Sequence, residues 1–178
     1  MLQLGAKPAG HWQGAHATPI DAQAPDGGTP LRQDGHSNTC NRYDYTHGIT
    51  VNSLAERFYD EGESNNSYTY AKTGRAVLSQ PGGIAYQIYD QKGINLFRLG
   101  AEYTDVYEEA ESISELATKI GLDPIALETT VIGFNQSCST EIPFSPGTLD
   151  GRSTKGLNIP KSNWANPIDT PPFRAYAV

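Results

Sequence analysis

Four histidines are the residues of this chain that first suggest metal or acid–base chemistry. His11 and His16 are five positions apart, and His36 and His47 lie farther along the chain. Zinc sites need three or four nitrogen, sulfur or carboxylate ligands at short, recognisable spacings. No thiol or carboxylate stands at such a spacing from these histidines, so the sequence predicts no metal site.

Two other kinds of chemistry find little support in the motifs. Gly82 and Gly83 lack the strand–Gly-x-Gly-x-x-Gly–helix context that holds a dinucleotide pyrophosphate. The Gly-x-Ser-x-Gly motif is absent, although counting residues does not exclude a Ser-His-Asp hydrolase of another kind. Motif spacing alone therefore assigns no function.

Composition excludes one class of partner and leaves the compartment open. The net charge is −7 and the 13 basic residues are scattered, which argues against nucleic-acid binding because phosphate contacts need clustered Lys and Arg. No apolar run approaches the roughly 20 residues of a membrane helix, and residues 1–6 do not resemble a signal peptide. We predict a cytoplasmic protein, or one whose targeting segment lies elsewhere. N-x-S triplets at Asn65 and Asn135 leave a secretory route open.

The two cysteines are compatible with two states. Cys40 and Cys138 are far apart in sequence and match no metal-binding pattern. They are either two buried or half-buried thiols or, in an oxidising compartment, a disulfide.

The elements that must position any site lie mainly in the middle of the chain. Residues 10–44 show no sustained period and read as a long loop, while 48–52 and 57–60 are short β-prone runs joined by a turn. The pattern over 68–80 predicts a helix that ends at Pro81-Gly82-Gly83. Residues 84–90 then alternate like a strand, with Ile84, Tyr86 and Ile88 on one side.

The second half of the chain predicts further helices and a final loop. Residues 93–99 are expected to form a short helix, and Ser112 with Glu115 forms a capping box for a helix that ends near Gly121. Asp123-Pro124 begins another helix, whose apolar stripe is Leu127, Val131 and Phe134. After Thr140 the chain reads as loop to its end. The predicted fold class is α+β, a small sheet with three to four helices and long loops.

Eight colinear segments resemble one enzyme family. The chain is similar to FAD-dependent tricarballylate dehydrogenase-like flavoproteins, which belong to the fumarate reductase and succinate dehydrogenase flavoprotein superfamily. The matching segments are GHWQGAHATPID (10–21), NRYDY (41–45), GITVN (48–52), RFYDEGE (57–63), SYTYAK (67–72), QPGG (80–83), KSNWA (161–165) and PPFRAYAV (171–178).

The resemblance implies a domain organisation and an activity. Residues 10–170 would form a capping domain resembling that of fumarate reductases, 1–9 the end of a flavin-domain segment, and 171–178 the return toward the flavin domain. FAD would be bound mainly by a domain outside this chain. The parent enzyme would dehydrogenate, or reduce, a CH–CH group of a small di- or tricarboxylate such as tricarballylate, by hydride transfer to flavin N5. The expected partners are this carboxylate and the FAD-binding domain, with no nucleic acid and no membrane, and the fragment alone would be inactive.

The resemblance also suggests roles for residues near the start of the chain. His16 and Thr18 stand where fumarate reductases have the His and Thr of a His-Pro-Thr motif that binds a substrate carboxylate, with Ala17 in place of the proline. Trp12 and Gly14 fall where the cap faces the cofactor. A histidine bonded only to loop backbone, and a tryptophan used only for packing, are the alternatives.

Four further residues are candidates for the site. Arg42 is near the position of an arginine in the fumarate reductase proton-delivery path, and Tyr70 stands where those enzymes carry their acid arginine. A tyrosine can donate a hydrogen bond or a proton but has no permanent charge. This departure therefore favours the tricarballylate branch over fumarate reduction. Lys72 and Arg75 are expected to bind substrate beside Arg42 and Tyr70 as catalytic residues, although a packing or surface role remains open for each.

Two other hypotheses remain. A stand-alone module that binds a carboxylate without redox activity predicts the same convergence of His16, Arg42 and Tyr70, with ligand affinity in isolation. An unrelated secreted protein predicts a Cys40–Cys138 disulfide and no convergence. A cap inserted into another domain predicts chain ends that lie close together on one face.

Overall fold

A four-stranded antiparallel sheet lies at the centre of the computed structural model, which describes residues 2–9, 17–24, 40–97 and 106–178. Its strands, in the order β1-β2-β4-β3, are β1 (Ile49–Val51), β2 (Tyr86–Tyr89), β4 (Phe173–Ala177) and β3 (Glu108–Ala110). Ile49 pairs with Ile88, and Tyr86 pairs with Ala177. Strands that are far apart in the sequence, β1 and β4, therefore lie in one sheet.

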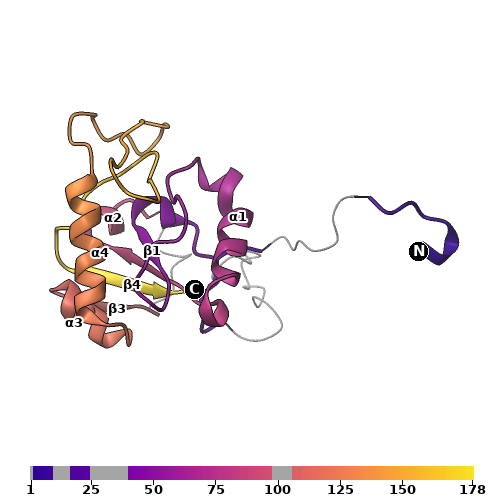
Figure 1. Cartoon of the computed structure of the whole chain (residues 1–178), viewed down its shortest axis with the longest axis horizontal. Helices are drawn as coiled ribbons and strands as arrows, with labels where there is room; N and C mark the ends of the chain where they lie inside the picture. The colour runs from indigo at the N-terminus through magenta and orange to yellow at the C-terminus, as the bar shows by residue number, and fades with distance from the viewer. Residues whose placement is uncertain (1, 10–16, 25–39, 98–105) are drawn as a thin grey trace, which may run out of the picture.

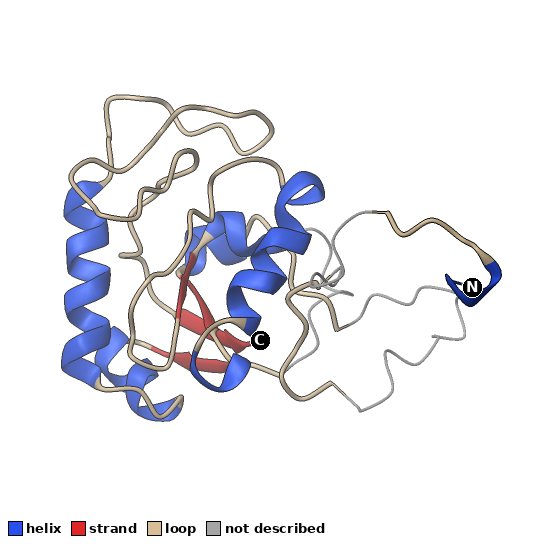
Figure 2. Cartoon of the chain, turned by 45° about the vertical axis from the view of Figure 1, so that its right-hand side comes forward, coloured by secondary structure: helices blue, strands red, loops and turns tan. Residues whose placement is uncertain are grey.

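Four α-helices surround this sheet in the described part of the chain. They are α1 (Asn66–Leu78), α2 (Gln91–Ile94), α3 (Ile113–Lys119) and α4 (Pro124–Ser137). In both views α1 lies across the sheet from α4 (Figures 1 and 2). Short 3₁₀ turns are η1 (Leu2–Leu4), η2 (Asp44–His47) and η3 (Pro81–Gly83). The predicted α+β class is confirmed.

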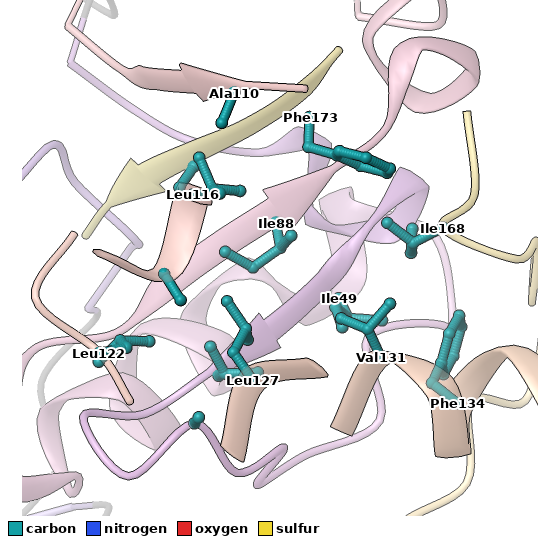
Figure 3. Packing of buried hydrophobic residues seen from close by; sticks show 14 of the residues in the cluster. Ile49, Ile88, Ala110, Leu116, Leu122, Leu127, Val131, Phe134, Ile168 and Phe173 are labelled. Atoms are coloured by element: carbon teal, nitrogen blue, oxygen red, sulfur yellow. The ribbon is translucent and has the colours of Figure 1, made fainter. Parts of the chain in front are cut away.

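The main core lies between the sheet and the pair α3 and α4 (Figure 3). Ile49 and Ile88 point from the sheet toward Leu127 and Val131 of α4, and all four are buried. Burying each of these side chains contributes about 1.5–3 kcal/mol of transfer free energy, which is why α4 keeps its apolar stripe on this face. The predicted stripe of α4 is confirmed.

The opposite face of the sheet is aromatic and polar. Gln87 and Tyr89 alternate with Ile88, and the Tyr89 phenol donates to the Gln87 amide oxygen at 2.8 Å. The rings of Tyr89 and Tyr176 meet edge to face with centroids 5.8 Å apart. The strand predicted within residues 84–90 is thus present as β2, and both of its faces are buried at Gln87, Ile88 and Tyr89.

The prediction of a loop after Thr140 was wrong at the end of the chain. Residues 173–177 form β4, which is bonded on both sides, to β2 and to β3. Successive residues of the run Phe-Arg-Ala-Tyr-Ala point to opposite faces of the sheet, as in any strand. The strand was missed because this run is short and directly follows Pro171-Pro172. Residues 57–60 were also predicted as a strand, whereas only Arg57 forms an isolated bridge, with Val51.

Helix starts follow the predicted capping chemistry in most places. Asp123 Oδ1 accepts from Ala126 N at 2.9 Å, and Ser112 Oγ accepts from Glu115 N at 3.1 Å. The Glu115 carboxylate forms an ion pair with Lys119 at 3.0 Å. The helix predicted over 68–80 begins earlier, at Asn66, because the Asn65 side chain caps it.

The irregular segment between α4 and β4 is held in place by aspartates. Asp60 accepts from the backbone N of Ser162 at 3.0 Å, and Asp150 accepts from that of Trp164 at 2.9 Å. Asp90 accepts from Thr170 N at 3.2 Å. These carboxylates satisfy backbone donors that a loop without regular structure would otherwise leave unpaired.

A cluster of charges is buried beside the Phe134 ring. Arg57 forms an ion pair with Glu61, and their side chains are 6% and 0% exposed. Glu61 Oε1 also accepts from Thr50 N at 2.8 Å. Lys161 is 1% exposed and donates to the Gly48 carbonyl. This cluster ties the segment 48–61 to the segment before β4.

Lys161 makes stability depend on pH in a defined direction. Burial lowers the pKa of Lys161 from 10.5 to about 8. Between these two values the unfolded chain binds a proton that the folded chain does not, so the free energy of unfolding rises with pH. We expect the protein to gain stability relative to Lys161→Met across this range, by up to about 1.4 kcal/mol per pH unit. Urea denaturation of both proteins at several pH values measures this gain. A stability difference between them that does not change with pH would contradict the prediction.

Candidate functional site

Helix α1 packs unusually closely against the segment that contains Ala17 and Thr18. A Cβ atom added to Gly74 would lie 2.5 Å from the carbonyl carbon of Ala17 and 2.6 Å from Thr18 N. Real Cβ atoms do not approach backbone this closely, so the contact requires glycine in the middle of the helix. Sequence patterns did not single out Gly74, although an isolated glycine inside a helical pattern is a signal of close packing.

Gly74→Ala is therefore expected to destabilise the chain, against the usual preference of helices for alanine. We expect the free energy of unfolding to fall by about 1–3 kcal/mol because the methyl group forces two backbones apart. Gly133 of α4 is the matched control, since nothing lies within 4 Å of its added Cβ. Gly133→Ala is expected to raise stability by up to about 1 kcal/mol. Urea denaturation measures the stability of both variants. A gain in stability in both would refute the close contact at Gly74.

Tyr70 lies on the same side of α1 as Gly74, one helical turn earlier. Its side chain is half-buried, and its ring meets the Tyr43 ring edge to face with centroids 5.6 Å apart. Asn66, a further turn along this side, donates from Nδ2 to the Tyr43 carbonyl at 3.3 Å. The structure thus places the Ala17–Thr18 backbone against Gly74, one helical turn from Tyr70 on the same side of α1.

Buried hydroxyl groups fix α1 in this orientation. The Tyr45 phenol and Thr69 Oγ1 are 2.7 Å apart, and the Tyr59 phenol and Thr50 Oγ1 are 2.9 Å apart. Burial raises the pKa of Tyr45, and that of Tyr59 well above its ordinary value, so both remain neutral. The Tyr45–Thr69 bond ties the helix that carries Tyr70 to η2, and the Tyr59–Thr50 bond ties the segment before the helix to β1.

Lys72 and Arg75 lie on the other side of α1. At about 100° per residue they are roughly 200° and 140° around the helix from Tyr70. Lys72 forms an ion pair with Glu63, in which the side chains are 67% and 45% exposed. Arg75 is exposed and forms no ion pair with a described residue. Neither converges with Tyr70 in this structure, and their substrate-binding roles remain predictions.

Arg42 occupies a buried structural position. Its side chain is 0% exposed and forms an ion pair with Asp21, and its guanidinium carbon lies 5.7 Å from the centroid of the Tyr176 ring. The Arg42 backbone bonds on both sides, from its N to the Pro19 carbonyl and from Gln87 Nε2 to its own carbonyl. These contacts join the segment 17–24 to the sheet, and a role in proton delivery remains a prediction.

Three predicted site residues lie outside the described part of the chain. They are His16, Trp12 and Gly14. The roles suggested for these three residues remain predictions.

A pocket opens at the first turn of α1, and the sequence did not predict it. Its volume is about 300 Å³. We call it the α1 pocket, and its lining residues are Asp44, Thr46, His47, Asn65, Asn66, Leu96, Pro146, Gly147 and Trp164. The lining comes from five separate parts of the chain, so neither spacing nor periodicity could have predicted it.

Two structural expectations can be compared directly with the fold. Ala22 N donates to the Ala177 carbonyl at 3.0 Å, so the segment 17–24 lies beside the last strand, whereas residues 2–9 lie away from the body (Figure 2).

Neither cysteine is in a disulfide, and Cys138 Sγ donates to the Phe134 carbonyl at 3.3 Å. The disulfide expected of an unrelated secreted protein is therefore wrong.

The described residues contain neither a metal-binding cluster nor a membrane-spanning helix. No group of three or more His, Cys, Asp or Glu side chains in these residues is arranged to hold a metal ion. Within the same ranges no helix has the length and hydrophobicity needed to cross a bilayer.

The fold is that of a domain found in fumarate reductase and ketosteroid dehydrogenase structures. The open conformation of a flavocytochrome c3 fumarate reductase superposes with a TM-score of 0.58 at 17% identity, covering 85% of this chain and 24% of that one. The 3-ketosteroid-Δ4-(5α)-dehydrogenase of Rhodococcus jostii RHA1, in complex with 4-androstene-3,17-dione, gives 0.56 at 22%, covering 78% and 26%. The 3-ketosteroid Δ1-dehydrogenase of Sterolibacterium denitrificans, in complex with 1,4-androstadiene-3,17-dione, gives 0.55 at 21%, covering 93% and 31%.

These similarities establish the fold, and they show how much of each similar protein this chain corresponds to. The chain spans about a quarter to a third of the length of these proteins. No protein-family model matches the sequence, and no curated protein matches it.

Proposed function

We propose that residues 10–170 are the substrate-capping part of an FAD-dependent oxidoreductase that acts on a small di- or tricarboxylate such as tricarballylate. The observation that carries the proposal is the contact between Ala17–Thr18 and Gly74. The contact supports the proposal because the segment predicted to bind a carboxylate packs against the helix that also carries Tyr70. The fold shared with a fumarate reductase supports the same conclusion.

The described residues do not fit the cofactor itself. The sheet is small and antiparallel, and no strand leads through a glycine-rich turn into a helix that could hold a pyrophosphate. FAD would therefore be held mainly by another domain, and when bound it would supply the hydride chemistry.

The part left to this chain is binding, orientation and proton transfer. The Thr18 hydroxyl can donate a hydrogen bond to a carboxylate oxygen, and the Tyr70 phenol can donate a hydrogen bond or a proton. A cap packed over the reacting atoms would also exclude water and so strengthen these interactions.

A neutral ketone is the second candidate substrate. Two of the similar structures hold steroid ketones. The Tyr43–Tyr70 ring pair brings no positive charge to the α1 face, and a phenol can donate to a carbonyl oxygen as well as to a carboxylate.

His16→Ala in the flavin-containing parent protein tests the carboxylate proposal. We expect it to weaken tricarballylate binding by roughly tenfold or more, since charge-assisted hydrogen bonds contribute about 1.5–3 kcal/mol, and to leave the flavin content unchanged. Unchanged kinetics with the active acid would remove His16 from the site. Titration calorimetry of the isolated 178-residue chain with tricarballylate tests the alternative, because only a stand-alone binding module needs no flavin domain.

A further inference from the structure

We propose that the α1 pocket binds a small uncharged molecule with several hydroxyl groups, such as a polyol or a monosaccharide. The proposal does not depend on the redox function. The pocket volume of about 300 Å³ is at the lower end of the range for ligand sites. At about 30 Å³ per water molecule, this space corresponds to roughly ten waters, enough for a six-carbon polyol.

Thr46 is the residue that points most directly to a ligand. It lines the pocket and is only 6% exposed. No hydrogen bond joins its hydroxyl to another described residue. The hydroxyl oxygen is not one of the fully buried unpaired polar atoms, so it reaches the open space of the pocket, and a ligand hydroxyl there would replace water as its hydrogen-bond partner.

The charges around the pocket select against anions. Asp44 carries a carboxylate, and the nine lining residues include no lysine or arginine. A carboxylate accepts hydrogen bonds from hydroxyl groups and repels a second anion. The side-chain amides of Asn65 and Asn66 line the same space and carry both donors and acceptors. This mixture matches hydroxyl groups, which donate and accept at once.

Trp164 provides an apolar wall held in a strained conformation. Its φ of 55° lies in the left-handed region, which a bulky residue rarely adopts. Its backbone N donates to Asp150 Oδ1 at 2.9 Å, and its indole N–H donates to the Thr148 carbonyl at 2.8 Å. Strain that is held in place this firmly is typical of functional sites. Together with Leu96, the tryptophan gives the C–H face of a polyol an apolar surface.

Protein-observed NMR of the ¹⁵N-labelled chain tests the proposal with two matched probes. Sorbitol and gluconate have the same six-carbon chain, but only gluconate carries a carboxylate. We expect sorbitol to shift the backbone amides of Thr46, His47, Asn66 and Trp164, and gluconate to bind at least about fivefold more weakly, because Asp44 repels it. The absence of sorbitol shifts at these residues, or tighter binding of gluconate, would overturn the proposal.

Thr46→Val removes the hydroxyl and keeps the shape of the side chain. We expect it to weaken sorbitol binding by roughly five- to tenfold, the usual value of one hydrogen bond. Thr118→Val is the control, because Thr118 is exposed on α3 and bonds only within its own helix. Equal affinity of the Thr46→Val variant and the parent chain would refute the role of Thr46. The comparison of sorbitol with gluconate decides the proposal even if Thr46→Val does not fold.

Discussion

Replacing Glu61 with glutamine is expected to lower the free energy of unfolding by about 3–5 kcal/mol, the usual effect of removing one partner from a buried ion pair. Glutamine keeps the shape and can still accept from Thr50 N, so the change isolates the lost charge. Arg57, 6% exposed, would be left facing a neutral amide, with the Lys161 ammonium group also buried nearby. Urea denaturation followed by circular dichroism measures the effect.

The control is the ion pair two residues farther along the chain. Glu63 pairs with Lys72, and both side chains are largely exposed. Exposed pairs of this kind contribute about 0–1 kcal/mol because water screens them. Glu63→Gln should therefore change stability by less than about 1 kcal/mol. Similar losses in the two variants would mean that the Arg57–Glu61 pair is solvated in solution.

Tyr70→Phe should slow turnover by roughly 100-fold in the parent flavoprotein, the lower end of what a positioned proton donor contributes. The variant removes one hydroxyl and keeps the edge-to-face contact with Tyr43. Stability and flavin content should change little. The measurement is kcat with the active substrate, compared at equal flavin absorbance.

Tyr68→Phe provides the matched control on the same helix. Tyr68 is 85% exposed, so its hydroxyl is solvated and its loss should leave kcat within about twofold. A Tyr70→Phe enzyme as fast as Tyr68→Phe would show that Tyr70 serves only for packing between α1 and Tyr43.

Local sequence signals predicted the helices better than the strands. Asp123-Pro124 and the stripe of Leu127, Val131 and Phe134 were sufficient to identify α4, because capping and a 3.6-residue period are both local. Helix α1 begins two residues before its predicted start, because the Asn65 side chain caps it. From the sequence alone, Asn65 is interpreted only as part of a glycosylation triplet.

The missed strands depend on contacts with distant residues. β3 reads Glu-Glu-Ala and has little β propensity of its own. It becomes a strand because Glu109 pairs with Arg174 in the ladder, and the Arg174 side chain forms an ion pair with the Glu109 carboxylate at 2.6 Å. β4 in turn pairs with β2, far earlier in the chain. No local period reports such pairings.

The candidate site was predictable only in part, and through family resemblance rather than spacing. Thr18 and Tyr70 are both predicted from the sequence, but the packing of the Ala17–Thr18 backbone against α1 depends on Gly74, which has no local signature beyond a helical glycine. The α1 pocket was not predicted at all, because Thr46 and Trp164 reach it from segments that are distant in sequence. Sites assembled in this way need the tertiary structure.

We propose above all that this domain caps a flavin. The decisive measurement is the visible absorbance of the parent protein, recorded without oxygen before and after the addition of tricarballylate. We predict a flavin spectrum that bleaches with tricarballylate or a related acid and does not change with 4-androstene-3,17-dione. Bleaching by the steroid alone would contradict the carboxylate substrate and favour the ketone. A colourless protein would contradict the capping function itself.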